Sequence, residues 1–220
     1  MSKLKLWEKV LGALGALIIG IIGGVILLRL DPPLREYFFP PKRKLTYYLL
    51  VQKMRDGKPY QEPFQSSGQE IFENGYEFKL SLLTPEERGY VYLFNEGYSA
   101  DGQNYFDILY PTPLRNNGSA EVAANQHVET GINEFSGKPD TEKLWIIWTK
   151  ELLPQLETAK AAAYAAEGRV TKPLEEYQLR EFLQTQQGSK PEVVKELASK
   201  QTTIVGTGNV VVYLQHLEHR

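Results

Sequence analysis

The amino-acid sequence predicts an α+β protein: an antiparallel β-sandwich-like domain with a C-terminal helical insertion, preceded by a single transmembrane helix. Three observations carry this prediction. The chain begins with a long apolar run, continues with segments that alternate apolar and polar residues as strands do, and then becomes alanine-rich. We therefore divide it into an anchor (1–30), a proline-rich basic linker (31–44) and a β-rich domain (45–220) with a helical insertion at about 152–200.

The anchor is a stretch of 19 residues, 10–28, without a charged or strongly polar side chain. As a helix it would span about 28 Å, enough to cross a hydrocarbon core of about 30 Å. A cleaved signal peptide has a shorter apolar region of about 7–15 residues and a small-residue cleavage site. The longer run, ending in Leu-Arg-Leu-Asp-Pro-Pro, favours an uncleaved anchor.

Small residues recur at every fourth position of the anchor, at Gly12, Ala16, Gly20 and Gly24. Such a line lets a second helix approach closely, so it predicts self-association or a protein partner in the bilayer. The alternative is that glycine is simply frequent in membrane helices.

The basic residues around the anchor give two opposed indications of sidedness. Three lysines precede it and five basic residues follow it, at 29, 35 and 42–44, which favours a cytoplasmic domain. A short tail with three lysines is, however, hard to translocate. We predict a protein of the bacterial inner membrane with an extracytoplasmic domain. The basic cluster at 42–44 would contact anionic headgroups or simply be solvated.

The stretch from 70 to 95 organises the domain. Residues 78–82 alternate apolar and polar side chains, as a half-buried strand does, whereas residues 90–94 are apolar on both faces. A strand apolar on both faces is covered on both sides, so we place it at the centre of a sheet. Between them, Thr84-Pro-Glu-Glu-Arg-Gly89 predicts a hairpin loop in which Gly89 supplies a positive φ.

The remaining elements follow from local signals. Further strands are predicted at 45–54, 105–110 and 143–149, with a polar loop at 114–137 and a closing hairpin around Gly206-Thr-Gly-Asn209. Helices are predicted at 155–167 and 173–187. A third helix should begin at Ser189, because Ser189-Lys-Pro-Glu192 has the spacing of a capping box.

Composition and motifs disfavour nucleic-acid binding, metal binding and catalysis. A net charge of −2 disfavours nucleic acid, and the absence of cysteine excludes disulfides and thiolate metal sites. No serine lies in a nucleophile elbow or beside an evident base. His216 and His219, three apart on a strand, should face opposite sides and not share a metal. We expect no cofactor, no metal and no catalytic residue; the tyrosines of the central strand serve the core or, alternatively, line a ligand groove.

Several short motifs resemble one bacterial family. They are Asn74-Gly75, Gly89-Tyr90-Val91-Tyr92-Leu93-Phe94-Asn95, Leu109-Tyr110-Pro111, Pro139-Asp140-Thr141-Glu142, and the final strand at 210–219. This combination is similar to the family known as domain of unknown function 4384. Asp140 and Tyr110 depart from the family pattern. The resemblance implies a β-rich accessory or interaction module and transfers no catalytic residue.

Together these features predict a function that does not involve catalysis. We expect a non-catalytic, single-pass, membrane-anchored interaction module, such as a small subunit of a larger membrane complex. The alternative is a ligand-sensing extracytoplasmic domain, and an enzyme is the least favoured interpretation.

Overall fold

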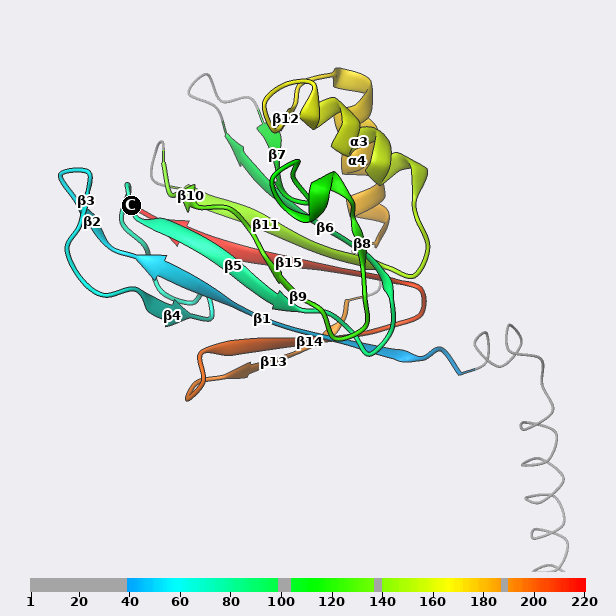
Figure 1. Ribbon diagram of the computed structural model, residues 1–220, viewed down its shortest axis with the longest axis horizontal. Coiled ribbons are helices and arrows are strands. Elements are labelled where there is room, and N and C mark those ends of the chain that lie inside the picture. Colours follow the sequence, from blue (N-terminus) through cyan, green and yellow to red (C-terminus); the bar gives the residue numbers. More distant parts are fainter. Residues whose placement is uncertain (1–38, 99–103, 137–139, 187–189) are drawn as a thin grey trace, which may run out of the picture. The chain divides into compact units, whose positions relative to one another are not determined.

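The computed structural model describes residues 39–98, 104–136, 140–186 and 190–220. The predicted anchor, with Gly12, Ala16, Gly20 and Gly24, lies outside these ranges. Within them, no helix is both long and apolar enough to cross a membrane. Residues Lys42–Arg220 form one compact unit (Figure 1).

Two antiparallel sheets make up most of this unit. The outer sheet has the order β10-β5-β1-β14-β13, with β4 beside β1 and β9 beside β5. Its strands are β1 (Lys42–Gln52), β4 (Phe64–Ser66), β5 (Glu77–Leu83), β9 (His127–Glu129), β10 (Asn133–Glu134), β13 (Glu192–Glu196) and β14 (Gln201–Thr207). A small hairpin, β2 (Met54–Arg55) and β3 (Lys58–Pro59), projects after β1.

The central sheet has the order β12-β7-β6-β11-β15, with β8 beside β6. Its strands are β6 (Gly89–Tyr98), β7 (Asn104–Tyr110), β8 (Glu121–Val122), β11 (Asp140–Thr149), β12 (Arg169–Val170) and β15 (Val210–His219). A 3₁₀ turn, η1 (Asn116–Gly118), follows β7, and two helices, α3 (Pro154–Tyr164) and α4 (Pro173–Gln186), follow β11.

The central sheet is covered on both faces. One core lies between the two sheets and includes Val91, Leu93 and Ile146. A second core lies between the central sheet and the helices and includes Phe94 and Ile147. Figure 1 shows α3 and α4 packed over this face. The prediction that residues 90–94 form a central strand, apolar on both faces, is therefore confirmed.

The two predicted hairpins are wrong. β5 belongs to the outer sheet and β6 to the central sheet, so residues 84–88 carry the chain from one sheet to the other. The turn between β14 and β15 makes the same crossing. Alternation determines which side of a strand faces the core but leaves its hydrogen-bonding partner open, and a short Pro/Gly loop suits either connection.

Gly89 is required for close packing, not for a turn, which corrects the sequence prediction. Its φ lies outside the left-handed region, in contrast to Gly208 at +84°. A Cβ at position 89 would lie 2.5 Å from the carbonyl oxygen of Thr149 and 2.6 Å from the Trp148 indole. No side chain larger than a hydrogen atom fits at position 89, where the start of β6 pairs with the end of β11.

Both predicted helices exist, and the third does not. The alanines of α3 at 159, 162 and 163 are buried against the sheet, which brings this helix close to it. Where a third helix was expected, β13 pairs with β14. The β-branched Val193 and Val194 together with a free sheet edge override the local capping signal.

The bounds predicted for the linker and for the polar loop also differ from those in the structure. β1 begins at Lys42, so residues 42–44 belong to the sheet. Arg43 points inward, 4 % exposed, and pairs with Glu87, which leaves Lys42 and Lys44 exposed beside it. The loop predicted at 114–137 contains three short strands and η1.

Candidate binding cleft

The inner face of the central sheet changes from apolar to polar toward one end. Alternation along β6 places Asn95 on the same face as Val91 and Leu93, and along β11 it places Glu142 on the face of Leu144 and Ile146. These polar residues border a cleft of about 620 Å³ between the end of this sheet and the edge of the outer sheet. The lining includes Phe78, Asn95, Tyr105, Asp107, Asn133, Glu134, Ser136, Glu142, Glu167 and Arg169.

The cleft lies at the end of the strands away from the linker. β1 begins at Lys42, which pairs with Thr207 of β14, and runs to its far end, where Val51 pairs with Phe78. Phe78 lines the cleft. In Figure 1 the beginning of β1 and the region of β10 accordingly occupy opposite ends of the sandwich.

Glu142 is the buried carboxyl of the cleft, with 7 % of the residue exposed. Asn95 Nδ2 donates to Glu142 Oε2 at 3.0 Å, and His219 Nε2 lies 3.7 Å from Oε1. Burial raises the pKa of Glu142 to about 7; the hydrogen bonds from Asn95 and the Ser136 backbone act in the opposite direction. Glu142 therefore changes charge near neutral pH.

Asp107 and Arg169 form a second polar pair in the cleft. β12 pairs with β7 so that these two residues are opposite each other, and the guanidinium donates to the carboxylate at 2.8 and 2.9 Å. The same guanidinium lies 3.8 Å from the centre of the Tyr105 ring. The one cation among the described lining residues is therefore already neutralised by a carboxylate and covered by an aromatic face.

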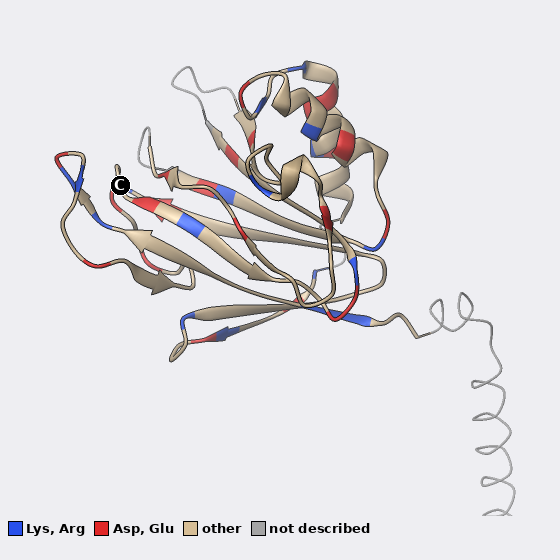
Figure 2. Ribbon diagram, in the orientation of Figure 1, with Lys and Arg blue, Asp and Glu red and all other residues tan. Residues whose placement is uncertain are grey.

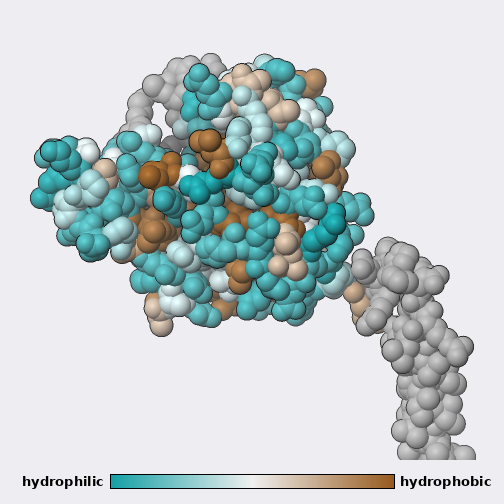
Figure 3. All heavy atoms as spheres, viewed as in Figure 1, coloured by the Kyte–Doolittle hydropathy of each residue, from teal (hydrophilic) through white to brown (hydrophobic). Residues whose placement is uncertain are grey.

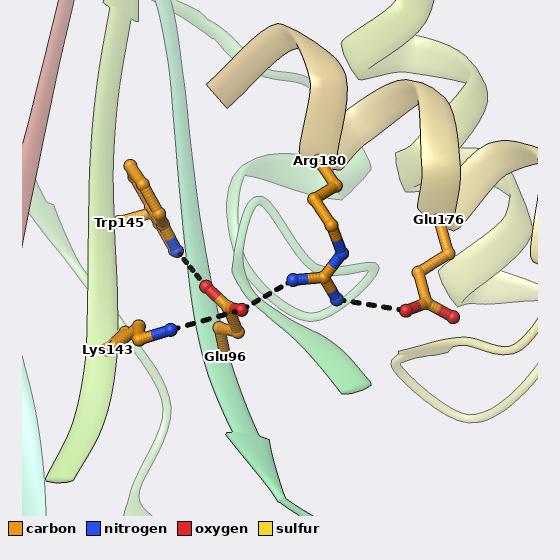
Figure 4. Close-up of polar contacts among 5 residues, drawn as sticks. All are labelled: Glu96, Lys143, Trp145, Glu176 and Arg180. Atoms are coloured by element: carbon orange, nitrogen blue, oxygen red, sulfur yellow. Dashed lines mark hydrogen bonds and ion pairs between the residues drawn. The ribbon is translucent and has the colours of Figure 1, made fainter. Parts of the chain in front are cut away.

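A different carboxyl, Glu96, is buried on the opposite face of the same sheet (Figure 4). Trp145 Nε1 donates to it at 2.9 Å, and Arg180 and Lys143 contact its other oxygen at 2.7 and 3.4 Å. Arg180 also donates to Glu176 at 3.0 Å, within α4. This cluster fixes α4 to the central sheet and has no access to the cleft.

One serine does lie beside a base, which corrects the sequence prediction. Ser81 Oγ and His127 Nε2 are 2.8 Å apart, and His127 Nδ1 lies 4.0 Å from Glu129 Oε1. Ser81 is only 3 % exposed, because β9 pairs with β5 at this position, and it is not among the residues that line the cleft. We interpret the contact as a link between these two strands.

Most of the motif residues belong to the scaffold. Gly89, Tyr90, Val91 and Tyr92 begin β6 at the end away from the cleft, where Tyr92 donates to Glu157 of α3 at 2.7 Å. Pro111 follows β7, Thr141 and Glu142 lie near the start of β11, and Pro139 lies outside the described residues. Among the described residues of the family motifs, Asn95, Leu109 and Glu142 line the cleft.

The sequence prediction gave the cleft residues no binding role, although a signal existed. Asn95 is the polar residue that follows Val91 and Leu93 on one face of β6. Glu142 is the polar residue that precedes Leu144 and Ile146 on one face of β11. The two histidines face opposite sides of their strand, as predicted: His219 is buried and His216 is exposed on the other side of β15. The described residues contain no cluster of three or more potential metal ligands.

Charged and apolar residues are mixed over the side of the described residues that Figures 2 and 3 show. Figure 2 shows both signs of charge distributed over the sheets and helices. On the face seen in Figure 3, apolar residues are interspersed with hydrophilic ones.

Comparison with known proteins found no matching family model, curated protein or solved structure.

Proposed function

We propose that this chain is a membrane-anchored, non-catalytic accessory module that binds another molecule through the cleft. The observation that carries the proposal is the cleft itself, which brings the buried carboxyl of Glu142 and the amide oxygen of Asn95, unpaired among the described residues, together at the end of the sandwich away from the start of β1. The resemblance to the bacterial accessory family supports the same assignment.

The chemistry of the cleft favours binding over catalysis. Arg169, the one cation among its described lining residues, is already paired with Asp107. Its buried carboxyl, Glu142, is flanked by the Asn95 amide, the Ser136 backbone and, at 3.7 Å, the His219 ring. Such a site recognises hydrogen-bonding groups. The predicted setting is the bacterial inner membrane, with the domain on the extracytoplasmic side.

The test is recovery of a partner from native membranes in mild detergent. Glu134, exposed at the rim of the cleft, would be replaced by Arg, and Glu192, exposed on β13, would receive the same change as a control. We expect E134R to lower partner recovery at least tenfold and E192R to leave it unchanged. Recovery of no companion protein, or equal loss in both variants, would contradict the proposal.

A separate variant tests the anchor. If the small-residue line contacts a partner helix, Gly20→Leu should weaken recovery even with the cleft intact. The second candidate function, ligand sensing, is favoured by the enclosed acceptors of the cleft. It predicts no companion protein and a small molecule that raises the melting temperature.

A further inference from the structure

The cleft contains more hydrogen-bond acceptors than donors. Among the described residues, the lining has four carboxylates, those of Asp107, Glu134, Glu142 and Glu167, and one guanidinium, that of Arg169. That guanidinium is held by Asp107 through two hydrogen bonds. The described part of the lining therefore supplies no basic side chain for the other three carboxylates and carries an excess of negative charge, which disfavours an anionic ligand.

A buried acceptor in the lining has no donor. The side-chain oxygen of Asn95 is buried and accepts no hydrogen bond from the described residues, while the nitrogen of the same amide donates to Glu142. Buried polar atoms are normally paired, so an orphan of this kind calls for an explanation. A ligand with N–H groups would supply the missing donor.

Glu142 has acceptor capacity to spare beside that orphan. An ionised carboxylate offers about four lone-pair sites. Asn95 and the backbone at Ser136 take two of them, and His219 Nε2, at 3.7 Å, lies beyond hydrogen-bond distance of Oε1. A charged carboxylate and an unpaired amide oxygen thus adjoin each other in a cavity.

We propose that the cleft binds a cationic N–H donor, an alkylammonium or guanidinium group, between Asn95 and Glu142. This inference rests on the proposed function and specifies the chemistry of its ligand. The group is either a lysine or arginine side chain of a partner protein or a free amine. Arg169 on the Tyr105 ring shows that the same cleft already accommodates one such group from its own chain.

The proposal is tested with the full-length chain in detergent. The probe is Nα-acetyl-lysine amide, with Nα-acetyl-norleucine amide as a neutral analogue of similar length, and binding is followed by NMR shifts of the backbone amide of Glu142 and of its neighbours in the cleft. We expect the lysine derivative to bind at least tenfold more tightly than the norleucine derivative. Diaminopentane and Mg²⁺ are titrated in parallel: tighter binding of diaminopentane identifies a free amine as the natural source, and tighter binding of Mg²⁺ contradicts the proposal.

Variants separate the cleft from general charge effects. Glu142→Gln and Asn95→Ser should each weaken binding of the lysine derivative at least tenfold, and the control Glu192→Gln should not change it. Equal binding of both amino-acid derivatives, or wild-type affinity in both cleft variants, would overturn the inference. If partner recovery depends on Glu134 while the lysine derivative does not bind, the proposed function stands and this inference falls.

Discussion

Two buried glutamates lie near one end of the central sheet, on opposite faces. Glu96 pairs across the strands with Lys143, the residue directly after Glu142, so one carboxyl points to the helices and the other to the cleft. Their exposures are nearly equal, 4 % and 7 %. Their partners differ: Glu96 meets two cations and an indole N–H, whereas Glu142 meets an amide, a backbone group and a more distant histidine.

The comparison teaches that burial alone does not make a carboxyl functional. A buried charge with enough donors and counter-charges is part of the scaffold, and removing it leaves its partners uncompensated. A buried carboxyl with too few donors is pushed toward its neutral form and retains the capacity to bind something else. The cleft is assigned on this second pattern.

The largest expected effect separates these two roles. Replacing Glu96, which is buried, by Gln removes the counter-charge of the partly buried Arg180 and Lys143 and should lower the free energy of unfolding by about 3 kcal/mol. Urea unfolding of the full-length protein in detergent, followed by tryptophan fluorescence, measures it. A loss below about 1 kcal/mol would contradict the structural role given to this cluster.

Replacing Glu142 by Gln should change the free energy of unfolding in the opposite direction from replacing Glu96. The Glu142 pKa of about 7 in the folded protein exceeds the ordinary 4.5, so the folded state binds the proton more tightly than the unfolded state. Stability from this group is therefore lost as pH rises from about 4.5 to 7. Glu142→Gln should remove this pH dependence and raise the free energy of unfolding by about 2 kcal/mol at pH 8.

The check is the same urea titration at pH 5 and pH 8. The difference between variant and wild type should be small at pH 5 and largest at pH 8. Destabilisation at both pH values would place Glu142 in the same structural class as Glu96 and break the comparison.

The smallest effect is expected at the rim of the Glu96 cluster. Lys143 contacts Glu96 at 3.4 Å with 30 % of its side chain exposed, and Arg180 remains as counter-charge when it is removed. Lys143→Met should cost no more than about 0.5 kcal/mol. A loss as large as that of Glu96→Gln would show that Lys143, not Arg180, is the principal partner.

The sequence was informative about strands and faces. Residues 90–94 and 143–149 are apolar on both sides because the central sheet has a core on each face, and that pattern can be seen without a structure. Both long helices were likewise visible from alanine content and Pro/Gly boundaries. These features depend on local periodicity and on burial, which are properties of the chain itself.

Strand pairing and the cleft were beyond the reach of the sequence. Two short loops resemble hairpin turns yet connect different sheets, and a capping signal at Ser189 gave way to the edge of β14. Asn95, Glu142 and Asp107 come from three strands that are neighbours only after folding. Which of these polar residues lie close together is therefore decided by long-range strand pairing.

The strand that follows the linker has a mechanical consequence. β1 lies inside the outer sheet, bonded to β14 along residues 42–47 and to β5 along residues 46–52. If residues 10–28 anchor the chain and the cleft holds a partner, as proposed above, tension between them would run along β1 and load two hydrogen-bond ladders in shear. A strand paired on both sides resists such a load with two ladders, whereas an edge strand has only one.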